Sequence, residues 1–202
     1  GMLAEGVKAP QKQHMRRLRK LLRYLKASDE WMTRVDCHAD IPVKQWGTSI
    51  QVHAFSDADW GGCASTRRSR SGTGVWLNGC LVTHSSKRQK AVSLSSCESE
   101  FYALSQTVCE AINVREIVNE LCDCDAKVFV YTDSTAAKAL ASKGGVGRNK
   151  HLQTRSLWVQ ERVQEDGVTL CKVATLANPA DLLTKIVCPA TQKRLRPAFG
   201  LP

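Results

Sequence analysis

The sequence predicts an α/β fold with a mixed sheet, and three observations carry this prediction. A segment of alternating character over residues 49–56 is followed by a hairpin signal at Asn78-Gly79. A long helical pattern then extends to about Leu121. Beyond it, residues 127–132 (KVFVYT) form a continuous β-prone run, typical of a central strand that is buried on both faces. A hairpin followed by alternating helices and strands favours a sheet with both antiparallel and parallel neighbours.

The composition is that of an ordinary globular chain. Of the 202 residues, 43% are hydrophobic and 24% are charged, which excludes a disordered tail, a fibre or a repeat array. The 29 Lys and Arg exceed the 19 Asp and Glu and give a net charge of +10, as expected for a protein that meets phosphate backbones or anionic membranes. No apolar run approaches the roughly 20 residues that span a bilayer. The nine cysteines are irregularly spaced, and we interpret them as reduced thiols of an intracellular protein.

The N-terminal part, residues 1–48, contains one basic amphipathic helix. Apolar residues recur at helical spacing between residues 11 and 26, and five basic residues surround them. This helix either forms a nucleic-acid or membrane surface or packs its apolar stripe on a neighbour, and a mitochondrial presequence is a weaker third reading. Gly1 is interpreted as an expression scar, and residues 27–48 show no sustained period and are predicted to be a linker.

The first half of the main domain is predicted to be strands followed by a helix. The first strand ends on Ser56-Asp57. Residues 73–77 and 80–84 flank Asn78-Gly79, which favours a type I′ turn. A short strand is predicted at 91–94, and it leads into the capping-box signature at 95–98 that begins the long helix.

The second half alternates helices and strands. The run at 127–132 stops at Asp133. The elements predicted after it are a helix at 134–142, a loop at 143–149, a helix at 150–165, a strand at 168–173 and a last helix with Asn178 as its N-cap and Pro179 in its first position.

Asp57 and Asp133 each stand where a predicted strand ends. Ligands of open α/β sheets bind outside the carboxyl ends of the strands, so the two aspartates can face one site if their strands are parallel neighbours. Asp59 competes with Asp57, but the turn at Gly61-Gly62 begins so soon after it that Asp57 is favoured.

Two more carboxylates join this set. Glu100 lies at the edge of the apolar stripe of the long helix, where a carboxylate is costly unless something such as a divalent metal neutralises it. Glu98 points away and is expected to reach back to the backbone of Ser95. Asp181 falls in the first turn of the last helix, where the helix dipole alone could explain it. Oxygen ligands from four separate elements suit Mg²⁺, and paired ions act on phosphodiesters.

Six motifs in order resemble the ribonuclease H domain of copia-type retrotransposon Pol polyproteins. They are SDADWGG (56–62), RRSRSG (67–72), SSKRQKAVSLSSCESEFYALS (85–105), YTDSTAA (131–137), NKH (149–151) and NPADLLTK (178–185). The resemblance covers residues 49–188 and implies a ribonuclease H-like fold with a five-stranded mixed sheet flanked by helices. Residues 16–28 look like the end of the preceding reverse transcriptase region, and residues 189–202 form a tail similar to that of the family.

The resemblance also implies an activity and its residues. It assigns Asp57, Glu100, Asp133 and Asp181 to two Mg²⁺ ions, with Mn²⁺ able to substitute, in hydrolysis of the RNA strand of RNA–DNA hybrids. His151 falls where related enzymes keep a mobile histidine, so it is expected to assist catalysis. SEF and GG replace the more usual AEY and AG of the family, but neither change touches a ligand.

The expected partners are an RNA–DNA hybrid and the reverse transcriptase domain of the same polyprotein, with no membrane and an intracellular location, either cytoplasmic in a virus-like particle or nuclear. Phosphates and 2′-hydroxyls of the hybrid call for basic and polar contacts near the site. The candidates are Arg67, Arg68, Ser85, Ser86, Lys87 and Gln89.

Two alternatives stay open at this stage. A catalytically inactive hybrid-binding module is less compatible with four carboxylates that would face phosphate. An integrase or transposase of the same broad fold places its glutamate after the second aspartate, whereas Glu100 here lies between Asp57 and Asp133.

Overall fold

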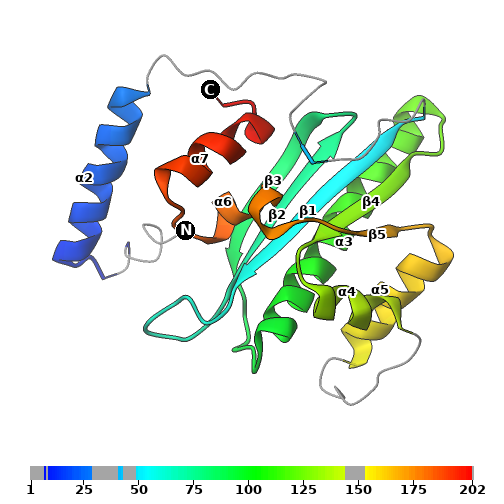
Figure 1. The fold of residues 1–202 in the computed structure, drawn as a ribbon, viewed down its shortest axis with the longest axis horizontal. Helices are drawn as coiled ribbons and strands as arrows, with labels where there is room; N and C mark the ends of the chain where they lie inside the picture. Colours follow the sequence, from blue (N-terminus) through cyan, green and yellow to red (C-terminus); the bar gives the residue numbers. More distant parts are fainter. Residues whose placement is uncertain (1–6, 8, 29–40, 43–48, 144–152, 202) are drawn as a thin grey trace.

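The computed structural model describes residues 7, 9–28, 41–42, 49–143 and 153–201, without the side chains of residues 153–156. Its centre is a five-stranded sheet in the order β3-β2-β1-β4-β5. Strand β2 pairs antiparallel with both β1 and β3, whereas β4 pairs in parallel with both β1 and β5. The predicted mixed sheet of five strands is therefore confirmed (Figure 1).

The hairpin forms as the turn signal predicts, but its strands are longer than expected. Strands β2 (Arg70–Leu77) and β3 (Cys80–Arg88) flank Asn78 and Gly79, both of which adopt positive φ. Strand β1 (Gln51–Asp59) continues through Ser56 and Asp57, where the prediction ended it. The polar residues at its end signal a loop in the sequence, yet they are paired in the sheet; the Ser56 hydroxyl, for example, donates to the backbone oxygen of Tyr131 at 3.1 Å.

Residues 91–94 do not form the predicted strand. They form bends that lead into the long helix, because their polar groups are satisfied locally. The Ser93 hydroxyl donates to the Gln89 side chain, and the backbone N–H of Leu94 donates to the Glu98 carboxylate at 2.6 Å. Glu98 thus reaches back to Leu94, while the Ser95 hydroxyl accepts from the Glu98 N–H as a helix cap does.

Helix α3 (Ser96–Cys122) covers one face of the sheet and builds the larger core. Its stripe of Phe101, Leu104, Val108 and Ala111 is fully buried against residues of β1, β2 and β4. The helix ends at Asp123, which adopts the left-handed conformation common at helix ends.

The predicted alternation of helices and strands after α3 is present. Strand β4 (Lys127–Thr132) is followed by α4 (Thr135–Ser142), then α5 (Gln153–Glu165) and β5 (Thr169–Lys172). The loop predicted at 143–149 lies outside the described residues except for its first residue.

The opposite face of the sheet is covered by short C-terminal elements: η2 (Thr175–Ala177), α6 (Asp181–Thr184), α7 (Pro189–Leu195) and η3 (Arg196–Phe199). Phe55, Trp76 and Phe199 belong to the core on this face. The Trp76 indole N–H donates to the backbone oxygen of Ala198 at 2.7 Å, which fastens the chain end to β2. The boundary placed at residue 188 stays a prediction, although residues beyond it contribute to this core.

The helix predicted to open at Asn178 and Pro179 begins later, at Asp181, and it is not the last one, because α7 follows it. Helix α6 has four residues, and its N-cap is Ala180. Asn178 is instead fully buried, and its side chain bridges two segments: it accepts from the Ala180 N–H at 3.1 Å and donates to the Ser56 oxygen at 2.9 Å. The amide therefore serves a contact with β1 and does not cap the helix.

Helix α2 (Lys12–Ala27) confirms the helix predicted in the N-terminal part. It has no buried residue, and Leu22 and Leu25 are about half exposed. It stands apart from the sheet on the side of α7 (Figure 1). Among the helices of the described ranges, none has both the length and the apolar character needed to cross a membrane.

Candidate metal centre

The pairing of β1 with β4 brings the first two carboxylates together. The strands are parallel neighbours, with Ser56 opposite Thr132, so Asp57 within β1 and Asp133 just after the end of β4 lie side by side. The Asp57 side chain has no exposed surface. A buried carboxylate needs a partner that offsets the loss of hydration.

Asp181 is brought to the same place by the C-terminal helix α6. The Asn178 side chain ties the start of α6 to Ser56, one residue before Asp57. On the other side, Gly72 of β2 lies opposite Asp57 in the sheet and gives α6 room to approach. A Cβ atom at Gly72 would lie 2.8 Å from Thr184 Cγ2 and 2.9 Å from Leu183 Cβ, so only glycine fits here without a shift.

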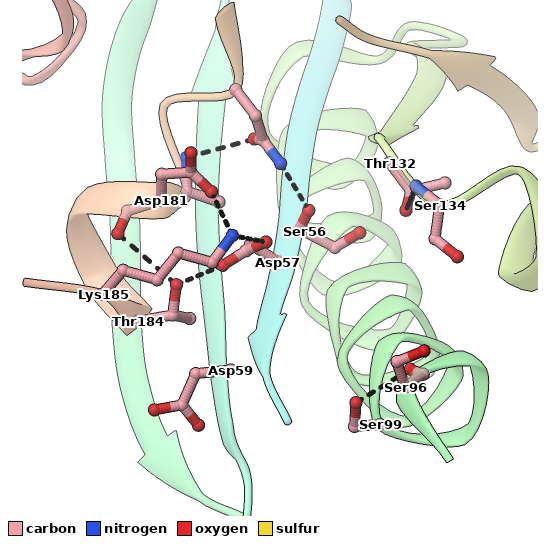
Figure 2. A network of polar contacts seen from close by, with 12 residues as sticks. Ser56, Asp57, Asp59, Ser96, Ser99, Thr132, Ser134, Asp181, Thr184 and Lys185 are labelled. Carbon is pink, nitrogen blue, oxygen red and sulfur yellow. Dashed lines mark hydrogen bonds and ion pairs between the residues drawn. The ribbon is translucent and has the colours of Figure 1, made fainter. Parts of the chain in front are cut away.

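Three carboxylates converge as a result. One oxygen each from Asp57, Asp133 and Asp181 lies within 4.8 Å of the others, which is a donor set of hard oxygens suited to a divalent cation. Asp59, the alternative to Asp57, lies elsewhere: its Oδ1 accepts from the Arg70 backbone N–H at 2.7 Å. Figure 2 shows Asp59 apart from the group formed by Asp57 and Asp181.

Glu100 faces this group from helix α3. Burial, followed by the negative charges of Asp57 and Asp133, raises the pKa of Glu100 to about 8. Its Oε2 atom is buried and has no hydrogen-bond partner among the described residues. A buried oxygen without a hydrogen-bond partner is unusual in a folded protein, and a divalent cation would satisfy it. The three aspartates therefore offer a donor set that fits a divalent cation, with Glu100 close by.

Two residues that the sequence reasoning did not select complete the centre. The Lys185 ammonium group lies 2.9 Å from Asp57 Oδ1 and 2.7 Å from Asp181 Oδ1. The Thr184 hydroxyl donates to the other oxygen of Asp57 (Figure 2). Both belong to the NPADLLTK motif. The spacing of four residues between Asp181 and Lys185 is the sequence signal that could have predicted their ion pair.

The charges in this centre depend on one another. Burial favours the neutral form of Lys185, but hydrogen bonds and charges from Asp181 and Asp57 outweigh it and raise the pKa of the ammonium group. For Asp181, burial outweighs the hydrogen bond from Lys185 and raises the pKa of the carboxyl group. One ammonium group therefore offsets only part of the negative charge that the four carboxylates can carry.

The predicted substrate contacts differ in how exposed and how engaged they are. Arg67 and Arg68 are exposed in the loop between β1 and β2. Ser86 is exposed on β3, and its hydroxyl donates to the backbone oxygen of Leu183, beside Thr184. The Ser85 hydroxyl oxygen is buried and has no partner among the described residues.

Lys87 lies near the end of β3, and Gln89 directly follows that strand. Both line a cavity of about 850 Å³ together with Tyr102 and Trp158. Lys87 is exposed and pairs with Glu110 at 3.6 Å. The Gln89 amide is engaged internally, because it donates to Ser71 Oγ and to the backbone oxygen of Ser99, each at 2.9 Å. His151 lies outside the described residues.

The fold defines the class of protein. The chain has a ribonuclease H-like fold. It superposes on the N-terminal ribonuclease H domain of a Mycobacterium tuberculosis protein with a TM-score of 0.50 and 15% identity, over 74% of this chain and 96% of that domain. At this identity the likeness concerns the fold alone. None of the known protein-family profiles matches the chain.

Sequence relatives identify the family. The chain is 31% identical over 188 residues to the retrovirus-related Pol polyprotein from transposon TNT 1-94 of Nicotiana tabacum, and 29% identical over 185 residues to that of transposon RE1 of Arabidopsis thaliana. These matches cover 93% and 91% of this chain but only 13% and 12% of the polyproteins. The chain is thus homologous to a segment of retrotransposon Pol polyproteins and has a ribonuclease H-like fold, which confirms the resemblance predicted from the motifs.

Proposed function

We propose that this chain is a metal-dependent endonuclease that hydrolyses the RNA strand of RNA–DNA hybrids during retrotransposon reverse transcription. The observation that carries the proposal is the convergence of Asp57, Asp133 and Asp181, within 4.8 Å of one another. Glu100, whose buried Oε2 atom has no hydrogen-bond partner among the described residues, lies near enough to be influenced by the charges of Asp57 and Asp133. A structural carboxylate cluster would be satisfied by internal donors, whereas this one keeps a buried oxygen without one.

The four carboxylates would hold two Mg²⁺ ions, with Mn²⁺ able to substitute. When bound, such ions make water a better nucleophile at neutral pH and stabilise the charge on the departing oxygen. The residues of this chain would position them: Thr184 orients Asp57 by donating to one of its oxygens, and Asn178 fixes the segment that carries Asp181. Glu100 must lose its proton to become a charged ligand, because its pKa lies near 8.

The substrate assignment is supported by charge and by position. A net charge of +10 favours a polyanion as partner. Arg67, Arg68, Ser85, Ser86, Lys87 and Gln89 are proposed to contact the phosphates and 2′-hydroxyls of the hybrid. Among these, Arg67, Arg68 and Lys87 are exposed and carry the charge that such contacts need. His151 is proposed to assist at the metal centre.

The direct test is cleavage of an end-labelled RNA–DNA hybrid with Mg²⁺. We expect the unaltered chain to cut the RNA strand and to leave the DNA strand and a DNA–DNA duplex intact. Asp57→Asn and Asp133→Asn should each abolish cleavage. The matched control is Asp125→Asn, which removes an exposed carboxylate outside the centre and should cut normally. If the unaltered chain cuts no better than Asp57→Asn, the enzymatic proposal is lost.

The same samples distinguish the enzyme from the alternative, a catalytically inactive hybrid-binding module. Salt-sensitive binding of the hybrid without Mg²⁺-dependent cleavage would identify an inactive hybrid-binding module. The reverse transcriptase domain of the same polyprotein is proposed as a partner, and adding it to the assay tests whether it raises the cleavage rate. The location, cytoplasmic in a virus-like particle or nuclear, stays a prediction.

A further inference from the structure

The Lys185 ammonium group occupies the space between two of the carboxylates assigned to metal. Its Nζ atom lies 2.9 Å from Asp57 Oδ1 and 2.7 Å from Asp181 Oδ1. Both distances are those of charge-assisted hydrogen bonds. A divalent ion that bound the same two oxygens at about 2.1 Å would lie close to the positive charge of the ammonium group, so the lysine and the ion would compete for this place.

The two oxygens of Asp57 have different partners. Oδ2 accepts from Thr184, which is buried, whereas Oδ1 accepts from Lys185, whose side chain is 37% exposed. The threonine contact is therefore fixed by the packing of α6, and the lysine contact is made by the end of a long side chain near the surface. The Lys185 contact is the one made by a long, partly exposed side chain, so its release needs only side-chain rotation toward solvent.

The position of Lys185 next to solvent allows its side chain to rotate away from the carboxylates. Lys185 is the first residue after α6, its backbone N–H donates to the Asp181 oxygen at 3.0 Å, and the next residue, Ile186, is 92% exposed. Rotation about the side-chain bonds of Lys185 would carry Nζ into solvent while the backbone hydrogen bond keeps Asp181 in place.

We propose that Lys185 is a built-in counter-cation, which holds Asp57 and Asp181 together in the metal-free protein and is displaced when a divalent cation binds. This inference rests on the metal centre of the proposed function. It has two consequences: the lysine stabilises the fold without metal, and it competes with the metal for the same carboxylate oxygens.

The test measures metal binding and stability and does not require turnover. Mn²⁺ binding is followed by electron paramagnetic resonance in the full chain and in Lys185→Met, which keeps the aliphatic stem and removes the charge. Lys127→Met is the matched control, since Lys127 is exposed at the far end of β4. Asp57→Asn identifies the part of the signal that belongs to the centre.

We expect Lys185→Met to bind Mn²⁺ about tenfold more tightly than the unaltered chain, because a positive charge that repels and competes with the ion is gone. In the presence of EDTA its melting temperature should fall, and a saturating amount of Mn²⁺ should remove the difference. Lys127→Met should match the unaltered chain in both measurements.

The outcomes are distinguishable. Equal or weaker Mn²⁺ binding by Lys185→Met overturns the counter-cation role and leaves the metal centre intact. Absence of Mn²⁺ binding in the unaltered chain overturns the metal centre and, with it, this inference. If Lys185→Met does not fold without metal, Lys185→Gln provides the uncharged arm, since its amide can still donate to one carboxylate, and the same gain in affinity is required.

Discussion

Replacing Gly72 with alanine tests how closely α6 must pack against the sheet for the acidic residues to meet. The added Cβ would lie 2.8 Å from Thr184 Cγ2, 2.9 Å from Leu183 Cβ and 3.0 Å from the backbone oxygen of Ala180. Carbon atoms in contact prefer separations of about 3.5–4.0 Å, so α6 must retreat by roughly 0.5–1 Å. Asp181 directly follows Ala180 and would move with it.

The structure sets the size of both effects. Inserting a methyl group into a packed site costs about 1–3 kcal/mol of unfolding free energy. A displacement of about 1 Å at a reacting centre costs roughly 100-fold in rate. We therefore expect Gly72→Ala to lower the melting temperature modestly and to lower the Mg²⁺-dependent cleavage rate about 100-fold.

A second substitution separates this mechanism from general destabilisation. Thr184→Ser removes Cγ2, which is the nearest obstacle, and keeps the hydroxyl that donates to Asp57. The double variant Gly72→Ala with Thr184→Ser should regain part of the rate and part of the stability, because the contacts with Leu183 and Ala180 persist. The measurements are thermal unfolding and single-turnover cleavage of a labelled hybrid, analysed as a double-mutant cycle.

Either of two results would contradict this prediction. If Gly72→Ala melts and cuts like the unaltered chain, α6 does not press on β2 as the structure has it. If the double variant recovers nothing, Thr184 is not the neighbour that the alanine displaces.

Three other predictions follow from the buried polar groups. Burial, then the charges of Asp57 and Asp133, raise the pKa of Glu100 from 4.5 to about 8, so the folded metal-free protein keeps a proton that the unfolded chain loses. Its stability in EDTA should therefore fall as pH rises from 4.5 to 8, and its affinity for Mg²⁺ should rise over the same range. Glu100→Gln should flatten both pH profiles, measured by thermal melts and by calorimetric titration. Unchanged slopes in this variant would contradict the prediction. Burial lowers the pKa of His53 from 6.5 to about 4, so the stability gained from its neutral form is full above pH 6.5 and is lost as pH falls toward 4; an NMR titration midpoint near 6.5 would be inconsistent with its burial. Trp76→Phe leaves the Ala198 oxygen without its donor and should cost about 1–3 kcal/mol in thermal unfolding, with faster proteolysis near the C-terminus; a loss of cleavage activity larger than the loss of folded protein would argue for a different role.

Much of the centre could be predicted from the sequence because local patterns place each acidic residue. Strand ends predict Asp57 and Asp133, and helical periodicity separates Glu100 from Glu98. The parallel pairing of β1 and β4 then makes the first two neighbours. These inferences need only the period of an element and the general rule about strand ends.

The remaining partners depend on tertiary packing, which local patterns do not encode. Lys185 and Asp57 are 128 residues apart, and nothing near either residue predicts their contact. The end of β1 was misplaced because Ser56, Asp57 and Asp59 are polar, although the tertiary structure supplies partners for them. The same holds for Asn178, which resembles a helix cap in the sequence but binds β1 in the fold.

The bridge from Asn178 to Ser56 has a consequence for how the chain acquires its structure. The two residues are 122 positions apart, and the parallel contact between β1 and β4 also closes a long loop. Such non-local contacts raise the contact order and slow folding. A nascent chain can complete the β2–β3 hairpin early, but the carboxylates can meet only after residue 181 has been synthesised and α6 has docked. Cation binding would thus report on the last stage of folding and distinguish a finished domain from a compact intermediate.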